Sequence, residues 1–474
     1  MERQPARSQR PAWLVVLVLC VIGVLSAFQF TMLIPLLGIF PALLGESVSD
    51  VQWLVTTTLL ASAVTTPLVA KSADMFGKRR LLLICLALIM LGSVVAITAS
   101  TLPQLIAARA LQGVGGAVVP IGIAMMRDSL PPHRLGWGIA LLSTTSGIGV
   151  AVGLPVGGLL YESFGWQAPF WATLIIAGCL LAFVPLAMSG GGPRTGGRFD
   201  WLGAVLLSIA LVAALLVVSK VGEWGPLSPL TLGIAALAIA AAALWLLSAR
   251  WAAEPIVELG TTFSRPVALL NTATFFLGLA VFGNMIITTA QWQVPAEGGG
   301  PGLSSVEAGL LMTPSSLALI GFSPLAGWLM GRIGAKATIV LGGVLTAIAC
   351  VERIFTIDDV PWTVAGTILL SAGTALNLAA TPALLIPFVP VAETTQANGV
   401  NSIVRGIGSA FGSAIIAAAF SVVAVTAAGV EYPTDLAFVI IFAVGAVTAV
   451  VSIALTLPIP RPPALVREGG AGAR

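Results

Sequence analysis

The sequence predicts an all-α polytopic membrane protein, and three observations support this fold class. Hydrophobic residues make up 58% of the 474 residues and charged residues only 9%, with a mean hydropathy of +1.04. Soluble domains are roughly 45–50% apolar, so this chain has too few polar residues to cover soluble domains. The apolar residues form continuous runs of about 20 residues, the length that crosses a bilayer. The runs do not alternate with polar residues, which indicates helices rather than barrel strands.

The apolar runs predict fourteen transmembrane helices. Their approximate limits are 13–34, 51–70, 81–99, 104–126, 137–160, 168–188, 201–219, 230–248, 267–289, 308–330, 337–351, 362–389, 401–427 and 437–457. The basic start followed by an apolar run resembles a signal peptide, but the run is too long for one. We therefore expect an uncleaved first helix.

The distribution of Lys and Arg predicts the orientation. With the N-terminus placed in the cytoplasm, nineteen of the 22 Lys and Arg residues, Arg405 among them, are counted inside. Only Lys220 and Arg353 fall outside, and Arg109 lies within the fourth span. Because cytoplasmic loops carry an excess of Lys and Arg, both termini are expected in the cytoplasm, with the chain in the plasma (inner) membrane.

An internal repeat appears when the chain is compared with itself at an offset of 257 residues. The aligned pairs include Pro67 with Pro324, Gly77 with Gly334, and Arg79 with Lys336. The match relates the second span to the tenth, so the two halves run parallel across the membrane, as in transporters with two parallel repeats. The predicted organisation is an N-terminal six-helix bundle (1–190), a linker with two extra transmembrane helices (191–265), and a C-terminal six-helix bundle with a short cytoplasmic tail (266–474).

Four short stretches carry motifs. "AKSADMFGKRR" contains Asp74, Gly77, Lys78 and Arg79; "RALQGVGGA" contains Arg109 and Gln112; "GVAVGLPVGG" contains Gly149, Gly153, Pro155, Gly157 and Gly158; and "RDSLPPHRLG" begins with Arg127 and Asp128. In this order they resemble the motifs of the major facilitator superfamily, specifically its fourteen-span drug:proton antiporter branch. Pro155 stands one place later than in the fifth-helix antiporter motif of that branch.

The resemblance implies a major facilitator fold of two six-helix bundles plus two inserted helices. It also implies a secondary active transporter that exports hydrophobic or amphiphilic organic compounds, multidrug-efflux-like, by proton-coupled alternating access. First-helix motifs of the branch usually carry an acidic residue where this sequence has Gln29. Without a visible buried carboxylate, a neutral or anionic solute suits the site better than a dication. The alternatives are an exporter of an endogenous lipid or secondary metabolite, or a non-transporting membrane scaffold.

The loop after the second span has two interpretations. It can be a plain topology anchor, because Lys78 and Arg79 lie at the phospholipid surface. It can also be a latch that closes the cytoplasmic side, in which Asp74 caps a helix end and Lys78 pairs with Asp128. Asp74 stands where the third span is expected to begin, and a carboxylate is favoured at a helix N-terminus. Gly77 permits the tight turn between the two spans.

Arg109 is the charge that we place near mid-membrane, where a charge usually faces a cavity or a partner. It either lines a central cavity and couples ion or substrate movement, or it is a structural residue satisfied by backbone carbonyls and Gln112. The glycines of the fifth span lie mostly four residues apart, which predicts a close helix contact. We expect this contact at the interface between the two halves.

Several other polar residues are candidates for cavity lining or, equally, for helix–helix hydrogen bonds. They are Gln29, Thr31, Asn271, Asn284 and Asn377. Asp50 and Glu307 each follow a serine three residues earlier and are expected to form helix capping boxes, with an external protonation site as the alternative. Glu352 is expected to form an ion pair with Arg353 at the membrane–water interface.

The composition also excludes several functions. One His and four separated Cys give no metal site or catalytic constellation, so we expect no enzyme and no cofactor, with the proton gradient as the energy source. No phosphate-binding loop is present. The expected partners are a small-molecule substrate and the lipid bilayer, without nucleic acid, and we expect a monomer.

Overall fold

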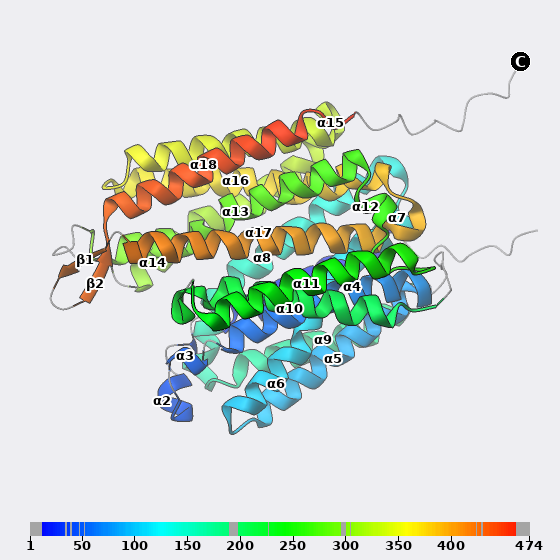
Figure 1. The fold of residues 1–474 in the computed structure, drawn as a ribbon, viewed down its shortest axis with the longest axis horizontal. Helices are drawn as coiled ribbons and strands as arrows, with labels where there is room; N and C mark the ends of the chain where they lie inside the picture. The colour runs from blue at the N-terminus through cyan, green and yellow to red at the C-terminus, as the bar shows by residue number, and fades with distance from the viewer. Residues whose placement is uncertain are drawn as a thin grey trace, which may run out of the picture.

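The computed structural model describes residues 12–33, 36–37, 40–46, 48–51, 53–188, 198–225, 227–294, 300–303, 305–422, 424–427 and 430–460. It is a bundle of long helices that run roughly side by side (Figure 1). The α-helices are α1 (Ala12–Thr31), α2 (Phe40–Leu44), α3 (Val48–Val51), α4 (Trp53–Phe76), α5 (Lys78–Thr98), α6 (Leu102–Gln112), α7 (Val118–Ser129), α8 (Pro132–Phe164), α9 (Ala168–Ala187), α10 (Trp201–Trp224), α11 (Pro229–Trp251), α12 (Leu259–Thr262), α13 (Arg265–Gln293), α14 (Ser305–Leu311), α15 (Thr313–Phe355), α16 (Val360–Leu385), α17 (Thr394–Val422) and α18 (Asp435–Thr456). Short 3₁₀ helices lie at η2 (Gly113–Ala117), η4 (Ile386–Phe388) and η5 (Val391–Glu393).

The predicted fold class is confirmed. Among the described residues, ten helices are long and apolar enough to cross a membrane, and the total of fourteen stays a prediction. The strands in this part of the chain are β1 (Ala424–Ala427) and β2 (Val430–Pro433), an antiparallel pair between α17 and α18. They lie with α2 and α3 at one end of the molecule (Figure 1, left).

The predicted limits 401–427 for the thirteenth span are wrong at the C-terminal end, because α17 covers Thr394–Val422 and residues 424–427 form β1. The helix also begins seven residues before the predicted span. The polar residues at its start are buried and hydrogen-bonded, so they belong to the helix although hydropathy excludes them. Arg405, which was counted among the cytoplasmic charges, is consequently the twelfth residue of α17 and lies well inside the bundle.

The packing follows the chain order. Helices α1–α9, here called the N-terminal helices, pack mainly on one another, as do the C-terminal helices α13–α18. The pair α10 and α11 lies between them in sequence, and α10 packs against both α4 and α17. The two sets meet where α8 contacts α15 and α16, and where α4 and α7 contact α17. Figure 1 shows α17 running through the middle of the bundle, beside α13.

The buried core is divided in the same way. One apolar cluster, formed mainly by the N-terminal helices, includes Leu19, Leu82 and Met126, and a smaller one within the C-terminal helices includes Leu270 and Leu384. The outer helices instead expose large apolar side chains, as expected for surfaces that face lipid. Only 11% of the most apolar 18-residue stretch of α11 is buried within the protein.

The glycines of α8 correct one expectation. A Cβ at Gly149 would overlap the Val24 carbonyl of α1, and one at Gly153 would overlap the hydroxyl of Thr31. A Cβ at Gly157 would overlap the carbonyl of Met32, directly after α1. These glycines therefore bring α8 against α1 within the N-terminal helices, and not against the other half as we expected. Small residues allow such close helix approach in membranes. Gly147 alone of the span's described glycines lies against α15, at Leu319.

The internal repeat has a structural counterpart at two turns. Gly77 between α4 and α5 has φ 107°, and Gly334 within α15 has φ 83°, so α15 is two helices joined at a left-handed glycine. Arg79 donates to the carbonyl of Pro185 near the end of α9 (3.3 Å). Its repeat partner Lys336 likewise donates to the carbonyl of Leu457 at the end of α18 (2.6 Å).

Candidate functional site

Asp74 joins the two sets of helices where α4 ends and α5 begins. This end of the molecule is here called the motif-loop end (Figure 1, right, with α12). Its carboxylate is 2% exposed and accepts a hydrogen bond from the Thr395 hydroxyl (2.6 Å) and another from the Gln396 backbone N–H (3.2 Å). Asp74 therefore caps the N-terminus of α17, where exposed N–H groups and the helix dipole favour a negative charge.

The structure corrects which helix Asp74 serves. Asp74 belongs to the last turn of α4, and α5 begins at Lys78 with only Gly77 between them. The helix N-terminus that it caps is more than 300 residues further along the chain. Gly399 supports the contact, because a Cβ there would already lie 3.2 Å from the Ala70 Cβ on α4. The carboxylate thus ties one set of helices to the other.

Lys78 and Asp128 form the predicted ion pair, with Nζ 2.6 Å from Oδ2. The pair joins the first turn of α5 to the last turn of α7, and the Lys78 side chain is only 4% exposed. A cation at a helix N-terminus and an anion at a helix C-terminus are each disfavoured by the helix dipole. The pairing offsets this cost and holds α5 and α7 together.

Exchanging these two charges tests the pair. We expect Lys78→Asp and Asp128→Lys each to lower transport about tenfold, because each leaves a like-charged, largely buried pair. The double variant should recover to within about threefold of wild type, since the exchanged charges also suit the two helix dipoles. Transport in proteoliposomes is the measurement. A double variant as weak as the sum of the single ones contradicts the ion pair.

Arg127 makes a second contact across the two sets. Its guanidinium donates to the carbonyls of Val389 (3.2 Å) and Pro390 (3.4 Å), and to the hydroxyl of Thr394. These groups lie between α16 and α17 at the motif-loop end. Asp74 and Arg127 therefore hold the start of α17 from two helices, α4 and α7, and this end of the interface is closed.

A third contact comes from the segment that follows the two extra helices. Lys71 on α4 lies 3.7 Å from Glu258, and Thr261 on α12 donates to Glu393 in η5 (2.6 Å). The segment from Glu258 to Thr261, here called the strap, therefore reaches both sets of helices. Burial raises the pKa of Glu258, and the nearby Lys71 charge only partly opposes that effect.

The raised pKa of Glu258 predicts a pH dependence. A carboxyl whose pKa is higher in the folded than in the unfolded chain stabilises the fold fully below the unfolded value of about 4.5, and that contribution is lost as the pH rises through the folded pKa. We expect wild type and Glu258→Gln to melt alike at low pH, and the wild type to lose stability relative to the variant as the pH rises. Melting curves of both, with exposed Glu162→Gln as control, measure this, and parallel curves would count against it.

Arg109 is sealed among the N-terminal helices, at 1% exposure. Its guanidinium donates to the side chain of Gln112 (2.7 Å), to the carbonyl of Gln29 (3.0 Å) and to that of Leu54 (3.4 Å). Gln112 in turn donates to Ser93 (3.0 Å). These bonds join α1, α4, α5 and α6, and they are the bonds that the structural alternative for Arg109 requires.

The fourth span changes its helix geometry directly after this network. The 3₁₀ segment η2 separates α6 from α7, and mid-helix 3₁₀ turns often mark hinges. A Cβ at Gly115 would overlap the amide of Gln29, and one at Gly116 would overlap the Ser62 hydroxyl. The glycines of "GVGG" thus make room for α1 and α4. Gln29 Nε2 donates to the Gln112 carbonyl (3.2 Å).

The other candidate lining residues that the structure describes all lie at helix contacts. Asn271 accepts from Asn401 between α13 and α17 (2.9 Å), and Asn377 donates to Gly373 within α16, against Gly342 of α15. Thr31 packs on the glycines of α8. The side chains of Asn284 and Pro155 lie outside the described residues, as does Ser47, so the capping box at Asp50 is not described.

The expected pair of Glu352 with Arg353 is not what the structure shows. Arg353 is fully buried and donates to Thr288 (3.0 Å) and Gln291, with its guanidinium 4.5 Å from the Phe442 ring centroid. Burial explains the difference, because a sealed guanidinium is satisfied best by nearby polar atoms of α13. The exposed carboxylates Asp50 and Glu307 lie in the first turns of α3 and α14, respectively.

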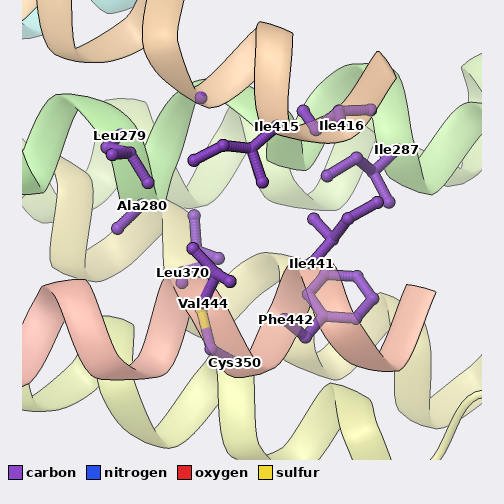
Figure 2. Close-up of a pocket in the computed structure, with 12 residues that line it drawn as sticks. Leu279, Ala280, Ile287, Cys350, Leu370, Ile415, Ile416, Ile441, Phe442 and Val444 are labelled. Atoms are coloured by element: carbon purple, nitrogen blue, oxygen red, sulfur yellow. The ribbon is translucent and has the colours of Figure 1, made fainter. Parts of the chain in front are cut away.

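The C-terminal helices also enclose a small apolar cavity of about 20 Å³ (Figure 2). Its described lining comes from α13, α15, α16, α17 and α18, and includes Leu279, Cys350, Leu370, Ile415 and Phe442. None of the described side chains that line it carries a nitrogen or oxygen atom, so a water would find no partner among them. We interpret it as a packing gap and not as a substrate site.

Some of these residues were missed by sequence reasoning. The polar run "TTQAN" before an apolar stretch is a recognisable helix start, and it supplies Thr395 and Gln396 to Asp74. Arg127 stands beside Asp128 in a motif, but nothing in the sequence indicates that it reaches Val389. The strap has no sequence signal beyond its charges.

Comparisons with known proteins agree with this geometry. The sequence model of the Major Facilitator Superfamily matches residues 19–197 and 268–473. The multidrug resistance protein Stp of Mycobacterium tuberculosis is 30% identical over 373 residues, covering 77% of this chain and 68% of that protein. The tetracenomycin C resistance and export protein of Streptomyces glaucescens is 28% identical over 378 residues, covering 79% and 69%.

Two solved structures have the same fold. The human organic anion transporter MFSD10 (TETRAN) aligns with a TM-score of 0.67 at 17% identity, covering 94% of this chain and all of that one. The proton:xylose symporter XylE aligns with a TM-score of 0.66 at 13% identity, covering 95% and 96%. At these identities the likeness shows the fold alone.

Proposed function

Since the chain belongs to the major facilitator superfamily and is a membrane transporter and not an enzyme, we propose that it exports amphiphilic organic compounds by alternating access. The observation that carries the proposal is the buried cap of α17 by Asp74. A carboxylate that joins two helix sets at one end can hold that end closed and release it when the sets rock apart. The relatives named for drug resistance and export support the direction and the substrate class.

We propose fourteen membrane crossings in two bundles with an inserted pair. To the ten apolar helices, the proposal adds one by dividing α15 at Gly334, and three more for α8, α13 and α17. These three are 33, 29 and 29 residues long, and about 20 residues suffice to cross a bilayer. The family match omits residues 198–267, which supports α10 and α11 as the insert. The charge distribution supports a plasma membrane orientation with cytoplasmic termini, so the motif-loop end is cytoplasmic.

We further propose that proton exchange drives export. Gln29 occupies the place where the branch usually has an acidic residue in the first helix. Exchange would therefore depend on other groups, and Asp74 is a candidate because its bonds break when the motif-loop end opens. An exporter of an endogenous lipid or secondary metabolite would use the same gate.

Transport by the purified protein in proteoliposomes tests the proposal. An imposed pH gradient should drive movement of an amphiphilic probe, tested as an anion (anilinonaphthalene sulfonate), a neutral analogue (N-phenylnaphthylamine) and a cation (ethidium). Wild type should move at least one probe faster than protein-free liposomes, and the movement should acidify or alkalinise the lumen in proportion. If no probe moves faster than in empty liposomes, the scaffold alternative is favoured.

A further inference from the structure

Three arginines lie deep within the helices, and one of them differs from the others. Arg109 and Arg353 are 1% and 0% exposed, and their guanidinium groups are held by carbonyls, hydroxyls and amides. Arg405 on α17 is partly exposed. Within the described part of the chain its guanidinium makes no hydrogen bond and no ion pair. Among the described residues, Arg405 is thus a partly exposed cation whose guanidinium has no hydrogen-bonding or ion-pairing partner.

Its depth is set by α17. Arg405 is the twelfth residue of that helix, which places it roughly 16 Å from the end capped by Asp74, at a rise of 1.5 Å per residue. The hydrocarbon core is about 30 Å thick, so this position is near its middle. On the neighbouring helix, Gly278 is also central, and its missing side chain makes room for the Arg405 backbone and stem.

The faces of α17 show where the side chain lies. Gly399 faces α4, Gly408 and Gly412 face α13, and Ile403 packs in a cluster with residues of α10. Between the face toward α4 and the face toward α13 lies a polar stripe, formed by Asn398, Ser402, Arg405 and Ser409 at spacings of four, three and four residues. At its edge, Ser409 donates to the Gly278 carbonyl of α13 (3.3 Å). Because α4 is one of the N-terminal helices and α13 one of the C-terminal helices, the stripe lies where the two sets meet.

The helices around Arg405 carry no carboxylate in their middle parts. Helices α1, α13, α16 and α17 contain no Asp or Glu. Helices α4, α7, α8, α10 and α18 carry them only near their ends, at Asp74, Asp128, Glu162, Glu223 and Asp435. An uncompensated charge at mid-membrane is costly and usually marks a substrate or ion pathway. Arginine is also the side chain that binds carboxylates, sulfonates and phosphates with two parallel hydrogen bonds.

We propose that Arg405 binds the acidic group of the transported compound, so that the preferred substrates are amphiphilic organic anions. The statement that the bound compound is also transported rests on the proposed function. Binding itself can be measured without transport. The apolar walls of the bundle would hold the hydrophobic part, and Arg405 would hold the anionic head between the two sets of helices.

Binding of two matched probes to the purified full-length protein in detergent tests this proposal. Anilinonaphthalene sulfonate carries an anion that N-phenylnaphthylamine lacks, and both are fluorescent. We expect Arg405→Gln to raise the Kd of the sulfonate at least about tenfold, equal to about 1.4 kcal/mol. The Kd of the neutral probe should change less than about twofold, because its contacts are apolar. Arg332→Gln, an exposed arginine beside Trp328, is the matched control and should change neither Kd.

The outcomes separate the proposal from its premise. A sulfonate Kd within twofold of wild type in Arg405→Gln overturns the role of Arg405, as does an equal loss of both probes. If Arg405→Gln does not fold, Arg405→Lys decides, because a retained charge must keep the preference for the sulfonate, and equal affinity for both probes overturns it. Arg405-dependent binding without any transport supports this inference and contradicts the proposed function. Unaltered sulfonate transport by Arg405→Gln supports the proposed function and contradicts this inference.

Discussion

Asp74→Asn is expected to lower transport at least tenfold while the protein still inserts and folds. The carboxylate accepts from the Thr395 hydroxyl and the Gln396 N–H at the positive end of α17. A hydrogen bond to a charged group contributes about 1.5–3 kcal/mol, and an amide at position 74 keeps the shape but removes the charge. The state in which the motif-loop end is closed loses that stabilisation relative to the open state. The equilibrium between the two states therefore shifts toward the open one, and the transport cycle slows.

Two measurements separate this effect from a folding defect. Transport is compared with Thr395→Val, which removes one donor and should lose less, and with exposed Glu162→Gln, which should lose nothing. The distance between spin labels at Arg80→Cys and Arg332→Cys, in a background without the four native cysteines, reports the motif-loop end. We expect longer and broader distances in Asp74→Asn. Full transport with an unchanged distance distribution contradicts the latch and favours the plain topology anchor.

The latch shows how far local sequence can go. The stretch around Asp74 and Gly77 predicted a cap and the Lys78–Asp128 pair, because a motif lists residue types and their spacing. It could not identify Thr395 as the partner, because that contact joins residues 321 apart and depends on how α17 packs on α4. The assignment of Asp74 to the start of α5 was wrong for the same reason. It was based on the helix nearest in sequence, whereas the carboxylate contacts a helix that is distant in sequence.

Helix packing also decided what could not be predicted for the glycines and for Arg405. The four-residue spacing of Gly149, Gly153 and Gly157 identified a close contact correctly, but any of several helices could have filled it, and α1 does. Arg405 was counted among the cytoplasmic charges because it is only the fifth residue of the predicted span 401–427. The buried polar residues before it belong to α17, which begins at Thr394, so Arg405 is instead the twelfth residue of that helix.

Arg109→Gln is the second change for which we expect a large effect, and it separates the two alternatives for this residue. The guanidinium supplies donors to the Gln29 and Leu54 carbonyls and to the Gln112 side chain. Removing it takes one donor from each of these buried acceptors, although the Leu54 carbonyl keeps its bond from the Thr58 hydroxyl (2.8 Å). A buried acceptor left without a donor costs about 1–3 kcal/mol.

We therefore expect a clearly lower melting temperature for Arg109→Gln than for wild type in the same detergent. Gln112→Met should lose less, because it leaves the two backbone acceptors bonded to Arg109. Transport per folded molecule then decides the role. If Arg109 only holds α1, α4, α5 and α6 together, folded Arg109→Lys keeps the wild-type dependence of transport rate on pH. If Arg109 couples ion movement, that dependence shifts in Arg109→Lys even where its melting temperature is restored, because a compact ammonium replaces the planar guanidinium and cannot hold the same carbonyls.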